Sequence, residues 1–119
     1  MNGFAAFSLR RELMQALDKM NFTEPTAVQR QVIPAFLAGR DLLVQARTGS
    51  GKTAAYALPL CQLCDVQCFF PQALILVPTR ELALQISEEI RAFSLYQRLH
   101  CVQLTGGTPM KTQKLQLRQ

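Results

Sequence analysis

The chain has 119 residues, of which 49% are hydrophobic and 18% are charged, and its formal net charge is +5. This length fits one small domain, and the composition is that of a globular protein and not of a disordered one. No apolar run is long enough to cross a membrane and no secretory leader is recognisable, so we expect a cytoplasmic protein (or a nuclear one in a eukaryote) without a membrane partner. The positive charge is compatible with a polyanionic partner but does not specify one.

The four cysteines are spaced in a way that first suggests a metal site. Cys61, Cys64 and Cys68 form a C-x-x-C-x-x-x-C run, and Cys101 follows the single histidine, His100. A tetrahedral site needs a second, separate pair of ligands, which this sequence does not provide. We therefore expect free thiols and no metal bound by cysteine.

Hydrophobic periodicity predicts helices that alternate with short apolar strands. Helices are expected over residues 9–20 with Ser8 as the cap, from Thr26 to Gly39, over residues 52–63, over residues 79–93, and after Thr108 and Pro109 with Lys111, Lys114 and Arg118 on one side. Strands are expected over residues 41–45, 72–77 and 101–104. The order α-α-β-α-β-α-β-α predicts an α/β fold, a parallel sheet with flanking helices.

The strongest chemical signal is the run Ala46-Arg47-Thr48-Gly49-Ser50-Gly51-Lys52-Thr53. It matches the phosphate-binding loop G-x-x-x-x-G-K-[ST], with Ala46 in place of the first glycine, and lies between an expected strand and an expected helix. Glycines let backbone N–H groups form a nest for phosphate, Lys52 offers a charge to the β- and γ-phosphates, and Thr53 offers a hydroxyl to Mg²⁺. Thr48, Gly49, Ser50, Gly51, Lys52 and Thr53 are therefore the candidate nucleotide-binding residues. The loop alone does not specify the reaction.

Three further stretches narrow the family. Residues 21–29, N-F-T-E-P-T-A-V-Q, resemble the Q motif of DEAD-box RNA helicases, and Phe7 matches the isolated aromatic upstream of it. Residues 78–83, P-T-R-E-L-A, resemble motif Ia of that family, and Gly106-Gly107 resembles its GG motif. The sequence departs from the family at Asn21, usually Gly, and at Ala27, usually Pro. The resemblance runs from Phe7 to Gly107 and covers nearly the whole chain.

This resemblance implies that residues 1–119 are the N-terminal part of the first RecA-like P-loop NTPase domain of an ATP-dependent RNA helicase that uses ATP and Mg²⁺. A glutamine amide complements the donor–acceptor edge of adenine, so Gln29 is expected to bind the base and Phe7 to stack on it. RNA backbone contacts are expected from Pro78, Thr79, Arg80, Gly106 and Gly107. The structural alternatives are a solvated Gln29, a core anchor at Phe7, a helix cap at Thr79 and a surface ion pair at Arg80 or Glu81.

The hydrolysis motifs of the family, D-E-A-D and S-A-T, do not occur in this sequence. We therefore expect the chain to bind nucleotide at most, and to need the remaining helicase parts as partners for hydrolysis. We also expect the sheet to be incomplete here, because strands from later in such chains flank the phosphate-loop strand, so that Leu42 to Val44 are exposed. A non-catalytic nucleotide- or RNA-binding module and another P-loop motor ATPase are the alternative functions.

Overall fold

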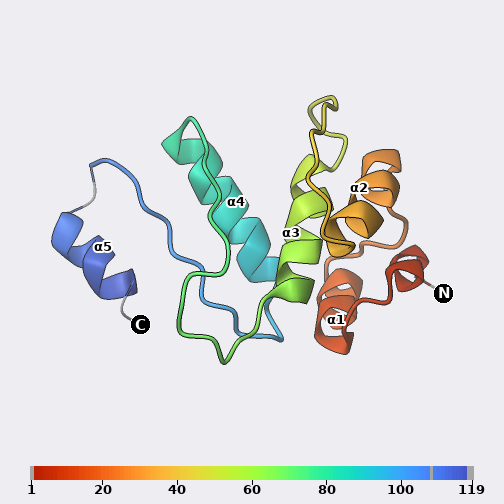
Figure 1. Cartoon of the computed structure of the whole chain (residues 1–119), viewed down its shortest axis with the longest axis horizontal. Coiled ribbons are helices and arrows are strands. Elements are labelled where there is room, and N and C mark those ends of the chain that lie inside the picture. Colours follow the sequence, from red (N-terminus) through yellow and green to blue (C-terminus); the bar gives the residue numbers. More distant parts are fainter. Residues whose placement is uncertain (1, 108, 118–119) are drawn as a thin grey trace.

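The computed structural model describes residues 2–107 and 109–117, and the regular elements in this part of the chain are all helical (Figure 1). They are the 3-10 helix η1 (Gly3–Phe7) and the α-helices α1 (Arg11–Lys19), α2 (Ala27–Leu37), α3 (Lys52–Leu63), α4 (Arg80–Phe93) and α5 (Met110–Leu117). The longest is α4 with 14 residues, and none of the described helices is long and apolar enough to cross a membrane.

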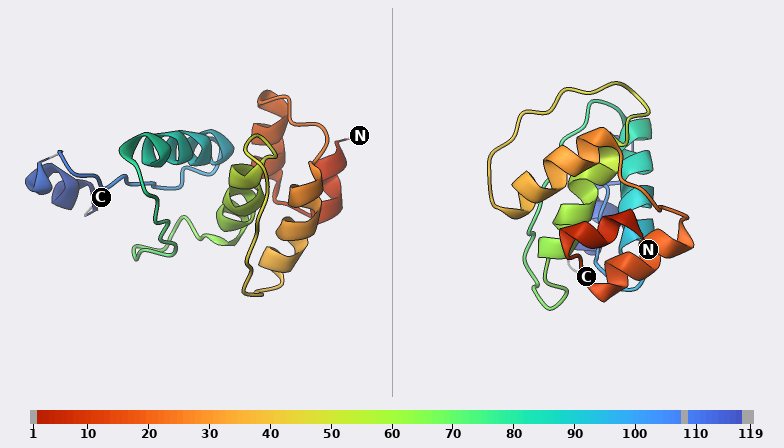
Figure 2. Two further views of the ribbon diagram at one scale, coloured as in Figure 1. Left: turned by 90° about the horizontal axis from the view of Figure 1, so that it is seen from above. Right: turned by 90° about the vertical axis from the view of Figure 1, so that its right-hand side faces the viewer.

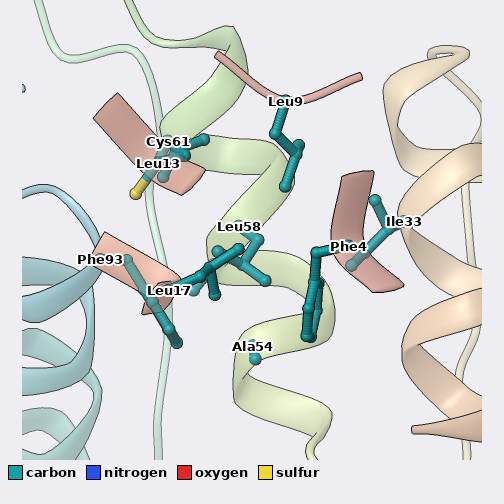
Figure 3. Close-up of a cluster of buried hydrophobic side chains, with 10 residues drawn as sticks. Phe4, Leu9, Leu13, Leu17, Ile33, Ala54, Leu58, Cys61 and Phe93 are labelled. Carbon is teal, nitrogen blue, oxygen red and sulfur yellow. The ribbon is translucent and has the colours of Figure 1, made fainter. Parts of the chain in front are cut away.

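Helix α3 lies at the centre of the structure and contacts α1, α2 and α4. The small side chains of Ala54 and Ala57 let neighbouring helices pack closely against α3. Leu58 and Cys61 complete its buried face. The core around it is formed by Phe4, Leu9, Leu13, Leu17, Ile33, Ala54, Ala57, Leu58, Cys61 and Phe93 (Figure 3). Burying each large apolar side chain contributes about 1.5–3 kcal/mol, so this cluster is the main source of stability and fixes the position of α3.

Aromatic rings join the N-terminal segment to α4. Phe22 packs edge-on against Phe93 with 5.7 Å between ring centroids, and Phe4 lies 6.2 Å from Phe22. The ring of Phe4 is fully buried on the side of α3 that faces Ile33 of α2 (Figure 3). The segment that leads into α2 is therefore anchored to the core at Phe22, within the Q motif.

Most helix predictions are confirmed, but the start of the first helix is wrong. Ser8 does not cap α1; it ends η1 in a left-handed conformation with φ 56°, and α1 begins only after Arg10. The reason is local, because the Asn2 side chain accepts a hydrogen bond from the backbone N–H of Phe4 and starts a separate turn that uses residues 3–7.

Helix α5 is also present, although two of the residues expected at its ends, Thr108 and Arg118, lie outside the described part. Figure 2 shows α5 set apart from the other helices. It is tied to the preceding segment by Gln113, whose carboxamide accepts from the Thr105 N–H and donates to the Thr105 carbonyl, both at 3.1 Å.

The three expected strands do not form, and no strand occurs within residues 2–107 and 109–117. Parallel strands are stable only when neighbours pair with their backbone groups and helices cover their faces, and residues 41–45, 72–77 and 101–104 do not pair with one another. Their apolar side chains stay exposed: Leu43 is 102% exposed, Leu74 81% and Leu76 84%. The expected exposure of residues 42–44 is confirmed, since Leu42 and Val44 are also 41% and 42% exposed.

Candidate functional site

The phosphate loop leads directly into α3. Gly51 is the N-cap of that helix with φ 87°, and Gly49 has φ 83°, so both positions use the left-handed conformation that favours glycine. A Cβ on Gly49 would meet nothing within 4 Å, so the loop is open to solvent on that side. The free N–H groups of the first helical turn attract anions, and Lys52 and Thr53 lie in that turn. The loop therefore fits a phosphate with its accompanying Mg²⁺.

The polar side chains of the loop are hydrogen-bonded within the loop itself. The Lys52 ammonium donates to the Ala46 carbonyl at 2.7 Å, and the Ser50 hydroxyl donates to the Arg47 carbonyl at 2.6 Å. Lys52 is exposed, so a phosphate can reach its ammonium from solvent. A phosphate oxygen is anionic, so it accepts a stronger hydrogen bond from the Lys52 ammonium than the neutral Ala46 carbonyl does. A phosphate ligand therefore favours release of the Lys52 side chain from the loop.

Gln29 connects the start of α2 to the phosphate loop. Its backbone N–H donates to the Thr26 hydroxyl at 3.4 Å and its Oε1 accepts from the Thr26 N–H at 2.9 Å, which makes a reciprocal capping box. Its Nε2 donates to the Gly51 carbonyl at 3.2 Å. Gln29 is 3% exposed, so the alternative of a solvated helix residue is wrong. Thr26 was missed as a site residue, although the T-x-x-Q pattern indicates a capping box.

Position 51 requires glycine because there is no room for a Cβ atom, as well as because of its backbone angle. A Cβ at this position would overlap the Gln29 Nε2 atom and come within 3.1 Å of the Thr26 hydroxyl. The phosphate loop therefore rests directly on the N-terminus of α2, and the expected base-binding and phosphate-binding residues are in contact.

A groove of about 1250 Å³ opens beside the loop. Its lining includes Gln29, Lys52, Thr53 and Pro78, together with residues 73–77. Thr48, Gly49 and Gly51 also line it. The groove thus brings the phosphate loop, the Q motif and the start of motif Ia around one space.

Tyr56 and Glu89 line the same groove, and the sequence did not single out either of them. Burial raises the pKa of the Tyr56 phenol, the nearby Thr53 side chain lowers it by less, and the negative charge of Glu89 also raises it. Burial also raises the pKa of the Glu89 carboxyl. Glu89 lies on the face of α4 that carries Ile86 and Phe93, where helical periodicity alone predicts an apolar residue.

Phe7 lies away from this groove. It is partly buried against the core, and its ring packs edge-on against Phe4 with 6.0 Å between centroids. It is not among the residues that line the groove. This placement agrees with the alternative of a core anchor, and stacking of Phe7 on a base stays a prediction.

The motif Ia residues meet the glycine pair. Thr79 caps α4, since its hydroxyl accepts a hydrogen bond from the Leu82 N–H at 3.1 Å. The Arg80 guanidinium lies against Gly106 and Gly107, where a Cβ would come within 3.3 Å and 2.8 Å of its nitrogens. The ion pair between Glu24 and Arg30 is the one present among the described residues, so Arg80 is not in a salt bridge there. The positive charge of Arg80 is thus available beside the exposed backbone of Gly106 and Gly107.

The cysteines are free thiols in the described chain. Burial raises the pKa of the Cys61 thiol to about 12, and burial also raises the pKa values of Cys64 and Cys101. Within residues 2–107 and 109–117 no group of three or more histidine, cysteine or acidic residues is arranged to hold a metal ion. Buried, protonated thiols are poor nucleophiles and poor metal ligands.

Comparisons with solved structures place this geometry in a known class. A DEAD box protein from Methanococcus jannaschii superimposes with a TM-score of 0.93 at 36% identity, covering 98% of this chain and 32% of that one. The RNA helicase Prp28 from Chaetomium thermophilum, solved with bound ADP, gives a TM-score of 0.84 at 40% identity over 99% of this chain and 30% of its own. The expected fold class, a RecA-like P-loop NTPase domain that is incomplete in this chain, is confirmed, although residues 2–107 and 109–117 contain helices of that domain and no strand.

Sequence comparisons agree. The model of the DEAD/DEAH box helicase family matches residues 26–119. The chain is 42% identical to the ATP-dependent RNA helicase DbpA of Bacillus subtilis over all of its length, and 44% identical to the ATP-dependent RNA helicase DHH1 of Debaryomyces hansenii over 96% of it. This chain belongs to the DEAD/DEAH box helicase family. It spans 25% and 22% of the lengths of these two relatives.

Proposed function

We propose that the chain is the nucleotide-binding portion of an ATP-dependent RNA helicase and binds an adenine nucleotide with Mg²⁺. The observation that supports this proposal most is the contact between Gln29 and Gly51, because it joins the phosphate loop to the amide that we propose reads the base. Gln29 uses one of its two N–H donors and one of its two Oε1 lone pairs inside the protein. One donor and one acceptor therefore remain for the complementary edge of adenine.

In this proposal the phosphates lie over Gly49 and at the start of α3. Lys52 exchanges the Ala46 carbonyl for the β- and γ-phosphate oxygens, and the Thr53 hydroxyl faces the cation. Bound Mg²⁺ neutralises phosphate charge, and Lys52 and the helix N-terminus add to that effect.

RNA is the proposed second ligand, held through its backbone. Arg80 lies on Gly106-Gly107 without a salt-bridge partner among the described residues, so it can pair with a phosphate where the absence of glycine side chains permits close approach. Pro78 and Thr79 come immediately before Arg80 and set the direction in which α4 begins. Such contacts are independent of base sequence.

Hydrolysis requires groups beyond these. The sequence contains no D-E-A-D and no S-A-T, so residues 1–119 supply neither the expected carboxylates for the cation and the attacking water nor a second domain with an arginine finger. We therefore propose binding without turnover for this chain by itself, and RNA-stimulated ATP hydrolysis only together with the remaining helicase parts. The alternative function, that of a P-loop motor ATPase of another class, predicts ATP hydrolysis that RNA does not stimulate.

Equilibrium binding of fluorescent ADP to the chain tests this function. The wild type should bind ADP in Mg²⁺, and Lys52→Ala should weaken binding by about 100-fold or more, because a charge-assisted contact to two phosphates is lost. Arg47→Ala is the matched control, since it removes an exposed cation of the same loop whose side chain has no assigned role. Retained tight binding by Lys52→Ala would overturn the assignment of the loop.

A further inference from the structure

Residues 101–107 run along α4 towards the start of that helix. The Arg91 guanidinium, near the end of α4, donates to the Cys101 carbonyl at 3.4 Å. One turn closer to the start of α4, the Ser87 hydroxyl donates to Oε1 of Gln103 at 3.3 Å. The segment therefore follows α4 in the opposite direction, and its path from α4 to α5 can be traced in Figure 1.

The lengths of the two elements bring the glycine pair to the start of α4. From Arg91 back to Arg80 the helix spans about 16 Å, at about 1.5 Å per residue. An extended chain covers about the same distance from Cys101 to Gly106, at about 3.3 Å per residue. The Arg80 guanidinium accordingly lies against Gly106 and Gly107.

Gln113 of α5 holds the backbone just before this glycine pair. Its Oε1 accepts a hydrogen bond from the Thr105 N–H and its Nε2 donates to the Thr105 carbonyl, both at 3.1 Å. Gln113 is 7% exposed, so these bonds lie where the low local dielectric strengthens them. Two bonds from one planar amide fix both the position and the orientation of the Thr105 backbone, as a neighbouring strand would do.

We propose that Gln113 is a positioning residue for the RNA phosphate site, and that it holds Gly106 and Gly107 in place beside Arg80. The proposal rests on the proposed function, because the assignment of Arg80 to an RNA phosphate comes from there. Gln113 acts through the Thr105 backbone and does not touch the RNA.

The glycine pair needs such an anchor because glycine loses more conformational freedom on ordering than any other residue. Both glycines are exposed, and Gly107 has φ 85°. Without the bonds to Thr105, this loop would sample many conformations and would become ordered only when RNA binds. That ordering would lower the affinity for RNA, whereas a loop that is held beforehand avoids the cost.

Solution NMR of the chain without RNA tests the anchor directly. In the wild type, the backbone order parameters of Gly106 and Gly107 should be those of an ordered chain, about 0.85. Gln113→Met keeps the size and helix propensity of the side chain but removes both bonds, and should lower these values below about 0.6. Gln116→Met is the matched control, since Gln116 is an exposed glutamine of α5, and should match the wild type. Flexible glycines in the wild type, or ordered ones in Gln113→Met, would overturn the proposal.

Fluorescence anisotropy with a uridine oligonucleotide tests the effect on RNA. Gln113→Met should weaken RNA binding by about 3- to 10-fold, as expected for the loss of these hydrogen bonds. Its affinity for ADP should stay within about twofold of the wild type, because neither Gln113 nor Thr105 lines the groove beside the phosphate loop. Unchanged RNA affinity, or an equal loss of ADP affinity, would contradict a role at the RNA site.

A second background makes the result specific to Arg80. In Arg80→Ala the added Gln113→Met substitution should have no further effect on RNA affinity, because the contact that Gln113 positions is absent. An equal loss in that background would show that α5 binds RNA itself, through its exposed Lys111 and Lys114, and would overturn the positioning role. Failure of a wild-type chain with ordered glycines to bind RNA would instead overturn the RNA part of the proposed function.

Discussion

The Nε2 atom of Gln29 donates a hydrogen bond to the carbonyl of Gly51 across 3.2 Å, and so joins the first turn of α2 to the residue that starts α3. The same carbonyl accepts the first helical bond of α3 from the Ala55 N–H at 3.2 Å. One side chain therefore holds the phosphate loop and carries the free donor and acceptor expected to recognise the base. Base recognition and loop geometry are coupled through a single amide.

This coupling predicts two effects of Gln29→Ala. The preference for ADP over GDP should disappear, and the affinity for inorganic pyrophosphate, which has no base, should fall by about 2- to 10-fold because the bond to Gly51 is lost. Gln31→Ala is the control, since Gln31 is an exposed glutamine on the same helix. Competition with fluorescent ADP measures all three ligands. Equal losses of ADP and GDP affinity would show that Gln29 does not read the base.

Replacement of Gly51 by alanine tests the close contact between loop and helix. Gly51→Ala should destabilise the fold by about 2–4 kcal/mol, because it adds the strain of a left-handed alanine to an overlap with Gln29. Gly39→Ala should cost only about 1 kcal/mol, since Gly39 has φ 80° but nothing lies within 4 Å of its Cβ position. Urea unfolding of both variants gives the difference. Equal losses of stability would contradict the contact.

Arg80→Ala should weaken binding of single-stranded RNA without changing any sequence preference. The loss of one phosphate contact should reduce the salt dependence of binding by about one charge. Arg30→Ala is matched in charge, but Arg30 pairs with Glu24 at 3.0 Å, so its loss should have little effect. Fluorescence anisotropy with a uridine oligonucleotide at several salt concentrations measures the slope. The same slope for Arg80→Ala and wild type would exclude Arg80 from the RNA site.

Cys61 should be chemically silent in the folded chain. With a pKa of about 12 its thiolate fraction at pH 8 is about 1 in 10,000, and the side chain is 1% exposed. Because the pKa is raised, reactivity should increase roughly tenfold for each pH unit up to that value. Mass spectrometry after iodoacetamide treatment should find Cys61 unmodified while the half-buried Cys68 reacts, and all four cysteines modified in denaturant. Reaction of Cys61 at the rate of Cys68 would show that the core around α3 is not formed.

The sequence predicts the helices well because each carries its own signals. Thr79 marks the start of α4 with a hydroxyl cap, and the glycines of the phosphate loop mark the start of α3 at Lys52. The strands fail for a non-local reason, since residues 72–77 need pairing partners that the described chain does not supply. An apolar run shows that a segment can be buried, and does not show whether its neighbour is present.

The sequence predicts the site residues that belong to a local motif. It does not predict contacts between residues that are distant in the sequence. Gly51 and Lys52 follow from the loop motif alone, whereas the contact of Gln29 with Gly51 joins residues 22 positions apart and is visible only in the structure. Glu89 and Tyr56 reach the groove because α3 and α4 pack together. Nothing in their local sequence distinguishes them from ordinary helix residues.

Thermal unfolding of this chain with Mg-ADP or Mg-GDP in excess tests the central claim most directly, because a ligand that binds only the folded state raises the melting temperature by mass action. ADP at about 100 times its Kd should raise Tm by roughly 5 °C or more, and GDP at the same concentration should leave Tm unchanged. That result would mean that residues 1–119 fold and contain an adenine-selective site. A cooperative transition that ADP does not shift, or that ADP and GDP shift equally, would contradict the account.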